Sequence, residues 1–171
     1  MITIEETAAT WRVTSEMLTV IAARKPSLPP PPSESSRAVQ LRVRAAGGEH
    51  QVVTLQGGPG GYRRTPCTEC PWRKDSAGVF PAEAFVHSAG TAYDMATEMF
   101  GCHQSGTAKP ATCAGFLLRG ADHNLTVRMG HMTGKFKRDV HDGGHALHAS
   151  YRDMAVANGV DPNHPALKPC R

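Results

Sequence analysis

Cys67-Thr-Glu-Cys70-Pro-Trp-Arg73 is the stretch from which the fold of this chain is predicted. A Cys-x2-Cys turn lets two thiolates bind one ion from neighbouring backbone positions, and two cysteines from elsewhere then complete a tetrahedron. Cys102 and Cys113 follow, so four of the five cysteines lie between residues 67 and 113. This uneven distribution predicts a metal site formed by Cys67, Cys70, Cys102 and Cys113.

The residue types leave the identity of the metal open. Four thiolates hold either one zinc ion or an iron–sulfur cluster, and we expect zinc, which needs no assembly machinery. Buried cysteines that act as small apolar side chains are the alternative without a metal. A disulfide framework is not expected, because residues 1–25 carry three glutamates and lack the apolar run of a secretory signal. A redox Cys-x2-Cys motif would need a βαβ pattern, which the sequence does not show.

The composition is that of a loop-rich fold with a modest core. Glycine and proline number 17 and 13 among 171 residues, and only 6% of the residues are aromatic. A structural metal often supplies the stabilisation that a small core lacks. No apolar run approaches the ~20 residues of a membrane span. We therefore expect a small, metal-stabilised α+β domain in a soluble, cytoplasmic protein without a membrane segment.

Three segments are predicted along the chain. Residues 1–25 are expected to form an amphipathic helix, because Thr3-Ile-Glu-Glu6 has the spacing of a capping box and apolar residues then recur at helical intervals. Residues 26–36 are a proline-rich linker. Residues 37–171 form the metal-binding α+β domain, with its core at 65–129.

Within this domain the patterns predict a hairpin and several short helices. Alternating apolar and polar residues predict a β-hairpin over residues 38–56, followed by a glycine-rich tether at 57–61. The remaining expected elements are helices at 81–89, 91–100 and 144–158 and a strand at 125–129.

Three histidines and the last cysteine have no assigned role. His141, His145 and His148 are spaced so that their rings would share one helix face, either as a second metal site or as a solvated polar face. The glutamate of the His-Glu-x-x-His motif is absent, because positions 142–144 are Asp-Gly-Gly. Cys170 lies apart from the other four cysteines and is either a spare ligand or a thiol without a function.

The excess positive charge is concentrated in residues 37–74. This segment holds seven basic and two acidic residues, whereas residues 75–171 hold nine of each. The pattern is typical either of a surface that binds phosphate backbones or of an ordinary solvated surface. Tyr62 and Trp72 are the nearby aromatic residues for base stacking. The candidate nucleic-acid-binding residues are Arg37, Arg42, Arg44, Arg63, Arg64, Arg73 and Lys74, and Lys135, Lys137 and Arg138 form a smaller basic cluster.

Four motifs in a fixed order resemble a known family. They are Cys67-x2-Cys70-Pro-Trp-Arg-x-Asp75, Gly78-x-Phe80-Pro81, Met99-Phe-x-Cys102-His103 and Cys113-Ala-Gly-Phe-Leu117. Together they resemble an uncharacterised family of small cysteine-rich proteins from bacteriophages and actinobacteria, over roughly residues 65–129. The resemblance implies the same four-cysteine site with His103 as a neighbour, and it implies no activity. The chain lacks the Gly-Val/Ile-Trp-Gly-Gly turn of WhiB-like iron–sulfur regulators.

Three hypotheses about function follow. In the first, the metal is structural, because four cysteines leave no open position on zinc, and the protein binds nucleic acid or a host or phage protein. In the second, it is an iron–sulfur redox or regulatory protein or enzyme, with His103 in acid–base chemistry. In the third, it is a phage structural or assembly component. No nucleophile triad, nucleotide-binding loop or dinucleotide fingerprint is present, and the sequence predicts no oligomeric state.

Overall fold

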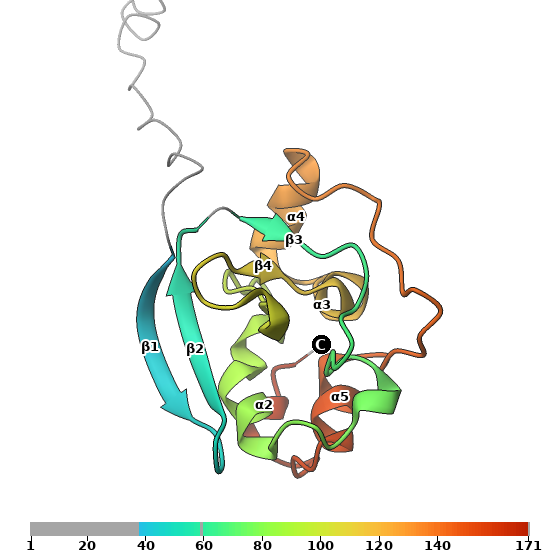
Figure 1. Cartoon of the computed structure of the whole chain (residues 1–171). Helices are drawn as coiled ribbons and strands as arrows, with labels where there is room; N and C mark the ends of the chain where they lie inside the picture. Colours follow the sequence, from blue (N-terminus) through green and yellow to red (C-terminus); the bar gives the residue numbers. More distant parts are fainter. Residues whose placement is uncertain (1–37, 59, 171) are drawn as a thin grey trace, which may run out of the picture. The chain divides into compact units, whose positions relative to one another are not determined.

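The computed structural model describes residues 38–58 and 60–170. The predicted helix at 1–25, the linker at 26–36 and Arg37 therefore lie outside the described residues. The described part contains four α-helices, two sheets of two strands each and several short 3-10 turns (Figure 1). It is an α+β fold, as predicted, whereas its stabilisation by a metal remains a prediction.

The predicted hairpin is confirmed. Strands β1 (Val39–Ala45) and β2 (Gln51–Gln56) pair in antiparallel register, with a bulge between Gln40 and Arg42. The hairpin lies along α2 (Ala82–Ser88) (Figure 1), and Arg44 donates a hydrogen bond of 3.4 Å to the His87 carbonyl. These strands belong to the domain surface, because every residue of β1 and β2 is exposed or half-buried.

The second sheet joins the glycine-rich segment to the region that carries the cysteines. Strand β3 (Gly61–Tyr62) pairs in parallel with β4 (Ala111–Thr112). The segment 57–61, predicted as a tether, therefore ends in a strand. Gly58 adopts a positive φ of 92° beside Pro110, where a Cβ atom would approach the proline ring to 3.2 Å.

The helices agree with the sequence patterns only in part. The helix predicted at 81–89 is confirmed as α2, which begins directly after Pro81. The helix predicted at 144–158 begins later, as α5 (Tyr151–Ala157), because Gly143 and Gly144 both have positive φ and Ser150 provides the N-cap. Helix α3 (Ala114–Arg119) begins immediately after Cys113.

Two predicted elements are wrong, and one side chain accounts for both. The strand predicted at 125–129 is helix α4 (Leu125–Met132), because the side chain of Asn124 accepts a hydrogen bond from the Val127 amide and caps the helix. The amide group of the same side chain donates to the carbonyls of Thr91 and Glu98. Only a 3-10 turn at Ala89–Ala92 and irregular backbone therefore replace the helix predicted at 91–100.

The core is built around Trp72, which is fully buried. Its ring makes edge-on or tilted contacts with the rings of Phe116, Phe100 and Tyr151, at centroid distances of 5.9 to 6.2 Å. Gly115 and Gly120 leave room for this ring, because a Cβ atom at either position would overlap it. Helices α2 and α5 contact each other beside this cluster. In residues 38–58 and 60–170, no helix has both the length and the apolar character needed to cross a membrane.

Candidate metal centre

The four predicted cysteine ligands come together in one place. The Sγ atoms of Cys70 and Cys113 lie 3.6 Å apart, and the Cys67 thiol is close enough to those of Cys70 and Cys102 for both to shift its pKa. All four side chains are buried, with at most 5% of each residue exposed. The five cysteines of the chain, all in its described part, carry free thiols. The structure thus gathers residues up to 46 positions apart in the sequence.

Backbone hydrogen bonds hold the three cysteine segments in position. The amide of Cys70 donates to the Cys67 carbonyl at 3.1 Å and closes the Cys-x2-Cys turn. The other two segments pair with each other, because the amide of Cys102 donates to the Ala111 carbonyl and that of Cys113 donates to the Phe100 carbonyl. This antiparallel contact brings together the two cysteines that have no local motif.

Each cysteine segment also contributes an aromatic ring to the core. Trp72 follows Cys70, Phe100 precedes Cys102, and Phe116 follows Cys113, and the three rings are in mutual contact. The thiols are therefore attached to the packed core of the domain. The prediction that Trp72 is available for base stacking is wrong, because none of its surface is exposed.

Burial and mutual contact raise the pKa of three of the four thiols and so favour their protonated form. Contact with Cys113, together with burial, raises the pKa of Cys70 to about 12. Contact with Cys67 and burial raise the pKa of Cys102. Contact with Cys102 lowers the pKa of Cys67, but contact with Cys70 and burial outweigh it, so that this pKa is raised as well. Two thiolates in contact repel each other in a buried site, and a bound cation removes this penalty.

Hydrogen-bond donors and basic side chains surround the sulfur atoms. The backbone N–H of Trp72 is directed at the Cys70 thiol and that of Gln104 at the Cys102 thiol, and both lower the pKa of the sulfur they face. Arg63 also favours the thiolate form of Cys102. Arg73 donates to the Cys67 carbonyl at 3.3 Å and is paired with Asp75. Such outer contacts stabilise the anionic sulfur that a metal requires.

His103 lies next to the cluster, as the resemblance implies. Its Nδ1 atom is 3.6 Å from the Sγ atom of Cys67, and its Nε2 atom is 3.9 Å from a carboxylate oxygen of Glu69. Burial lowers the pKa of His103, although Glu69 acts in the opposite direction. The ring therefore faces the cluster through one nitrogen and an acidic side chain through the other.

The chemistry of the donor set suits a single metal ion, and so does the spacing of one sulfur pair. Around zinc, with Zn–S distances of about 2.3 Å, neighbouring sulfur atoms of a tetrahedron lie about 3.8 Å apart, close to the 3.6 Å between Cys70 and Cys113. Within the described residues, however, no group of three or more His, Cys, Asp or Glu side chains is arranged to hold an ion as it stands. The sulfur atoms form a chain of pairwise contacts, Cys102–Cys67–Cys70–Cys113.

The other predicted residues do not form a second site. His141, His145 and His148 precede α5 and share no helix face, and only His148 is buried. Cys170 lies apart from the cluster, where its thiol faces the carbonyls of Ala89 and Ala166.

The predicted basic residues are distributed over separate parts of the domain. Arg42 and Arg44 lie on the hairpin, and Arg73 and Lys74 lie beside the cysteine turn. Arg63 and Arg64 follow β3, and Arg64 is paired with Asp139 at 2.8 Å. No sequence pattern indicates that Phe100 and Phe116 support the thiols, because their meeting depends on contacts between distant segments.

The fold and the cluster define a small α+β protein with four buried, clustered thiols. Residues 62–171 match the model of a family described as a family of unknown function (DUF6283), and the chain belongs to this family. The match includes all four cysteines and extends beyond the predicted range of 65–129. The search of curated proteins and the search of solved structures found no match.

Proposed function

We propose that this chain is a small cytoplasmic metal-binding protein in which Cys67, Cys70, Cys102 and Cys113 hold one zinc ion. The observation that carries the proposal is the contact of four buried thiols from three chain segments, with Sγ atoms of Cys70 and Cys113 at 3.6 Å. Buried thiols are inert as isolated residues, but four in contact form a complete ligand set for a tetrahedral ion. Metal binding would draw these neighbouring thiols into a tetrahedron.

The spacing favours a single ion over an iron–sulfur cluster. In a cubane cluster each cysteine binds a different iron, so its sulfur atoms are farther apart than around one ion. The 3.6 Å separation is shorter than such an arrangement accommodates without movement of the chain. The packing of the neighbouring aromatic rings opposes that movement, because Trp72, Phe100 and Phe116 contact one another and belong to the same packed core as the thiols.

The proposed role of the metal is structural. Four protein ligands leave no position for water or substrate, and the ion then links three segments of a small core. His103 acts as a positioning residue that donates a hydrogen bond from Nδ1 to the sulfur of Cys67. Arg63 and Arg73 offset part of the negative charge that four thiolates bring to one ion.

The metal would make the domain a rigid scaffold for binding a macromolecular partner, either nucleic acid or a host or phage protein. The cytoplasm suits the proposal, because thiolate ligands must stay reduced. An origin in a bacteriophage or an actinobacterium belongs to the same proposal.

Metal analysis of matched variants tests this function. The protein is produced with zinc in the medium, and bound zinc, iron and sulfide are measured for the unchanged chain, Cys70→Ser and Cys170→Ser. We expect one zinc per chain in the unchanged protein and in Cys170→Ser, which removes a thiol outside the cluster. Cys70→Ser should lose most of the zinc and unfold at a lower temperature.

A second measurement identifies the ligands. Cobalt(II) bound in place of zinc should give the absorption of a tetrahedral site with sulfur-to-metal charge transfer, and Cys70→Ser should weaken it. A protein that contains iron and sulfide would support the iron–sulfur alternative and overturn the zinc proposal. A protein that binds neither metal would overturn both.

A further inference from the structure

Two basic segments that are far apart in the sequence lie side by side. Residues 62–64 follow the glycine-rich segment, and residues 135–139 follow helix α4. The Tyr62 ring packs edge-on against Phe136 at a centroid distance of 5.5 Å. The basic cluster predicted at 135–138 and the arginines at 63 and 64 therefore belong to one surface, here called the 62–64/135–139 surface.

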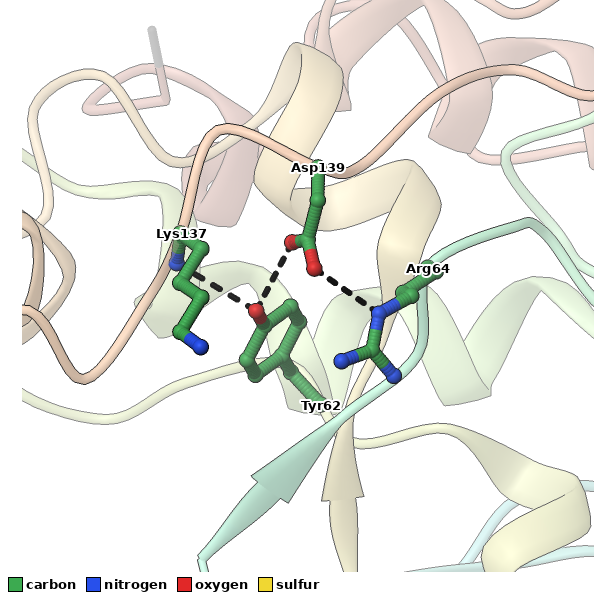
Figure 2. A network of polar contacts seen from close by, with 4 residues as sticks. All are labelled: Tyr62, Arg64, Lys137 and Asp139. Atoms are coloured by element: carbon green, nitrogen blue, oxygen red, sulfur yellow. Dashed lines mark hydrogen bonds and ion pairs between the residues drawn. The ribbon is translucent and has the colours of Figure 1, made fainter.

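A polar network fixes the relative position of the two segments, as Figure 2 shows. The Tyr62 hydroxyl donates to Asp139 at 2.7 Å and accepts from the Lys137 amide at 3.3 Å. Arg64 donates to the other oxygen of Asp139 at 2.8 Å. Further along the chain, the His141 amide donates to the Arg64 carbonyl. The backbone that bears the basic side chains of this surface is therefore held in place by these hydrogen bonds.

The charge of this surface is strongly unbalanced. Segments 62–64 and 135–139 carry five exposed basic residues, of which Arg63 also lies near Cys102, against one acidic residue, Asp139, a formal charge of +4 (5 − 1). The whole 171-residue chain has the same formal net charge of +4. Asp139 is already engaged by Tyr62 and Arg64 and is half-buried. The five basic residues are Arg63, Arg64, Lys135, Lys137 and Arg138.

The other basic residues predicted to bind nucleic acid do not converge from two distant segments. Arg44 lies on β1 and donates to the His87 carbonyl, and Arg73 lies beside the cysteine turn, where it is paired with Asp75. Arg42 and Lys74 are exposed but lie on separate elements. Within the described residues, the 62–64/135–139 surface is where basic residues from distant parts of the sequence converge.

We propose that the 62–64/135–139 surface binds the phosphate backbone of double-stranded DNA. Arginine and lysine side chains that are exposed on a fixed backbone match a regular row of phosphates. The surface offers no free ring for stacking on single-stranded bases, because Phe136 is 2% exposed and the Tyr62 ring is contacted by Arg64, with Cζ 5.6 Å from the ring centroid, and by Phe136. Binding would therefore depend on phosphates and be largely independent of base sequence.

An acidic protein is the weaker match for this surface. Stable protein interfaces have a dehydrated apolar centre with a polar rim. None of the large, exposed apolar side chains of the described residues lies in segments 62–64 or 135–139. The inference rests on the proposed role as a binding module, but it does not require the metal to be zinc.

Binding of a fluorescent 20-base-pair DNA duplex to the full chain, followed by anisotropy between 50 and 200 mM salt, tests the inference. The test variant combines Lys135→Ala, Lys137→Ala and Arg138→Ala, and it leaves Arg63, which faces Cys102, unchanged. The control combines Arg42→Ala, Lys74→Ala and Lys168→Ala, which removes the same charge from exposed positions elsewhere.

We expect the slope of log affinity against log salt to decrease by about 3 in the test variant, or about one for each phosphate that is no longer neutralised. The control should keep most of the original slope. An equal effect in both triple variants would overturn the inference. So would equal binding of a single strand of the same length or of polyglutamate.

Zinc content measured on the same samples separates this inference from the proposed function. If the unchanged protein holds zinc but does not bind the duplex at 50 mM salt, the surface assignment is wrong and the metal proposal stands. If duplex binding is abolished only in the test variant while the protein holds no zinc, the surface assignment stands and the metal proposal is wrong.

Discussion

Replacing Gly115 with alanine should destabilise the domain and weaken metal binding together. Gly115 lies in α3, two residues after Cys113. An added Cβ atom would lie 2.7 Å from Cγ of Trp72 and still closer to its Cβ atom. Trp72 cannot move away easily, because it is fully buried and packed against other aromatic rings. The two segments that carry Cys70 and Cys113 must therefore separate.

The expected magnitude combines two opposing effects. Overpacking of a core costs about 1–3 kcal/mol, and the cost should be near the upper end here because the overlap involves a Cβ atom. Alanine is about 1 kcal/mol more favourable than glycine within a helix. The net loss should be about 2 kcal/mol. At about 3 °C per kcal/mol for a chain of this size, the melting temperature should fall by about 6 °C.

Gly90→Ala is the matched control, because it makes the same substitution with no atom within 4 Å of the new Cβ. It should leave stability unchanged or raise it by about 0.5 kcal/mol. Thermal unfolding followed by circular dichroism, with and without a chelator, compares the variants, and competition with a zinc indicator measures metal affinity. If Gly115→Ala melts at or above the temperature of Gly90→Ala, the inferred contact between α3 and Trp72 is wrong.

Two further predictions concern stability. Burial lowers the pKa of His148, an effect that Lys74 reinforces and Asp153 opposes, so the unfolded state takes up a proton first as the pH falls. The free energy of unfolding should therefore decrease as the pH falls below the unfolded pKa of about 6.5. This decrease should be smaller in His148→Gln. Urea titrations of the unchanged protein and of His148→Gln between pH 7.5 and 5 test this, and the same dependence of the unfolding free energy on pH in both proteins would contradict it. Asn124→Ala removes the α4 cap and the donor to two carbonyls, and it should cost about 2–3 kcal/mol. Asn124→Asp keeps the cap but places a buried carboxylate against the carbonyls of Thr91 and Glu98, so it should cost at least as much; an aspartate variant that melts at the temperature of the unchanged protein would refute the role of the amide group.

Local patterns allow part of this structure to be predicted. The hairpin is predicted from the alternation of apolar and polar residues and from the glycines of its turn, and α2 is predicted from the proline that precedes it. The Cys-x2-Cys turn is predicted from the spacing of its two cysteines. Each depends on residues within a few positions of one another. The proximity of Cys102 and Cys113 is predicted from cysteine chemistry alone, and their pairing through the backbone of residues 100–112 has no local signal.

The wrong predictions share a physical cause, which is a contact between distant segments that overrides local preference. Residues 91–100 have an apolar spacing compatible with a helix, but the side-chain amide of Asn124 donates hydrogen bonds to two of their backbone carbonyls. Trp72 follows a polar turn, yet it is buried because Gly115 and Gly120 provide space more than 40 positions later. The basic segments at 63–64 and 135–138 are separate in the sequence and meet through contacts of Tyr62 and Arg64 with Phe136 and Asp139.

The start of the family match coincides with a physical division within the described residues. The matched segment begins at Tyr62 and includes the thiol cluster, the aromatic core and the whole 62–64/135–139 surface. The hairpin that precedes it contributes only Ala46, from its turn, to the buried apolar residues of the described part. Its polar contacts with α2, from Arg44 and to Glu83, are partly or fully exposed and add little stability. Both proposed sites therefore depend mainly on the packing of residues 62–170. The hairpin reaches the edge of the thiol cluster through ring contacts, because His50 packs against Phe80 and Phe80 packs against His103.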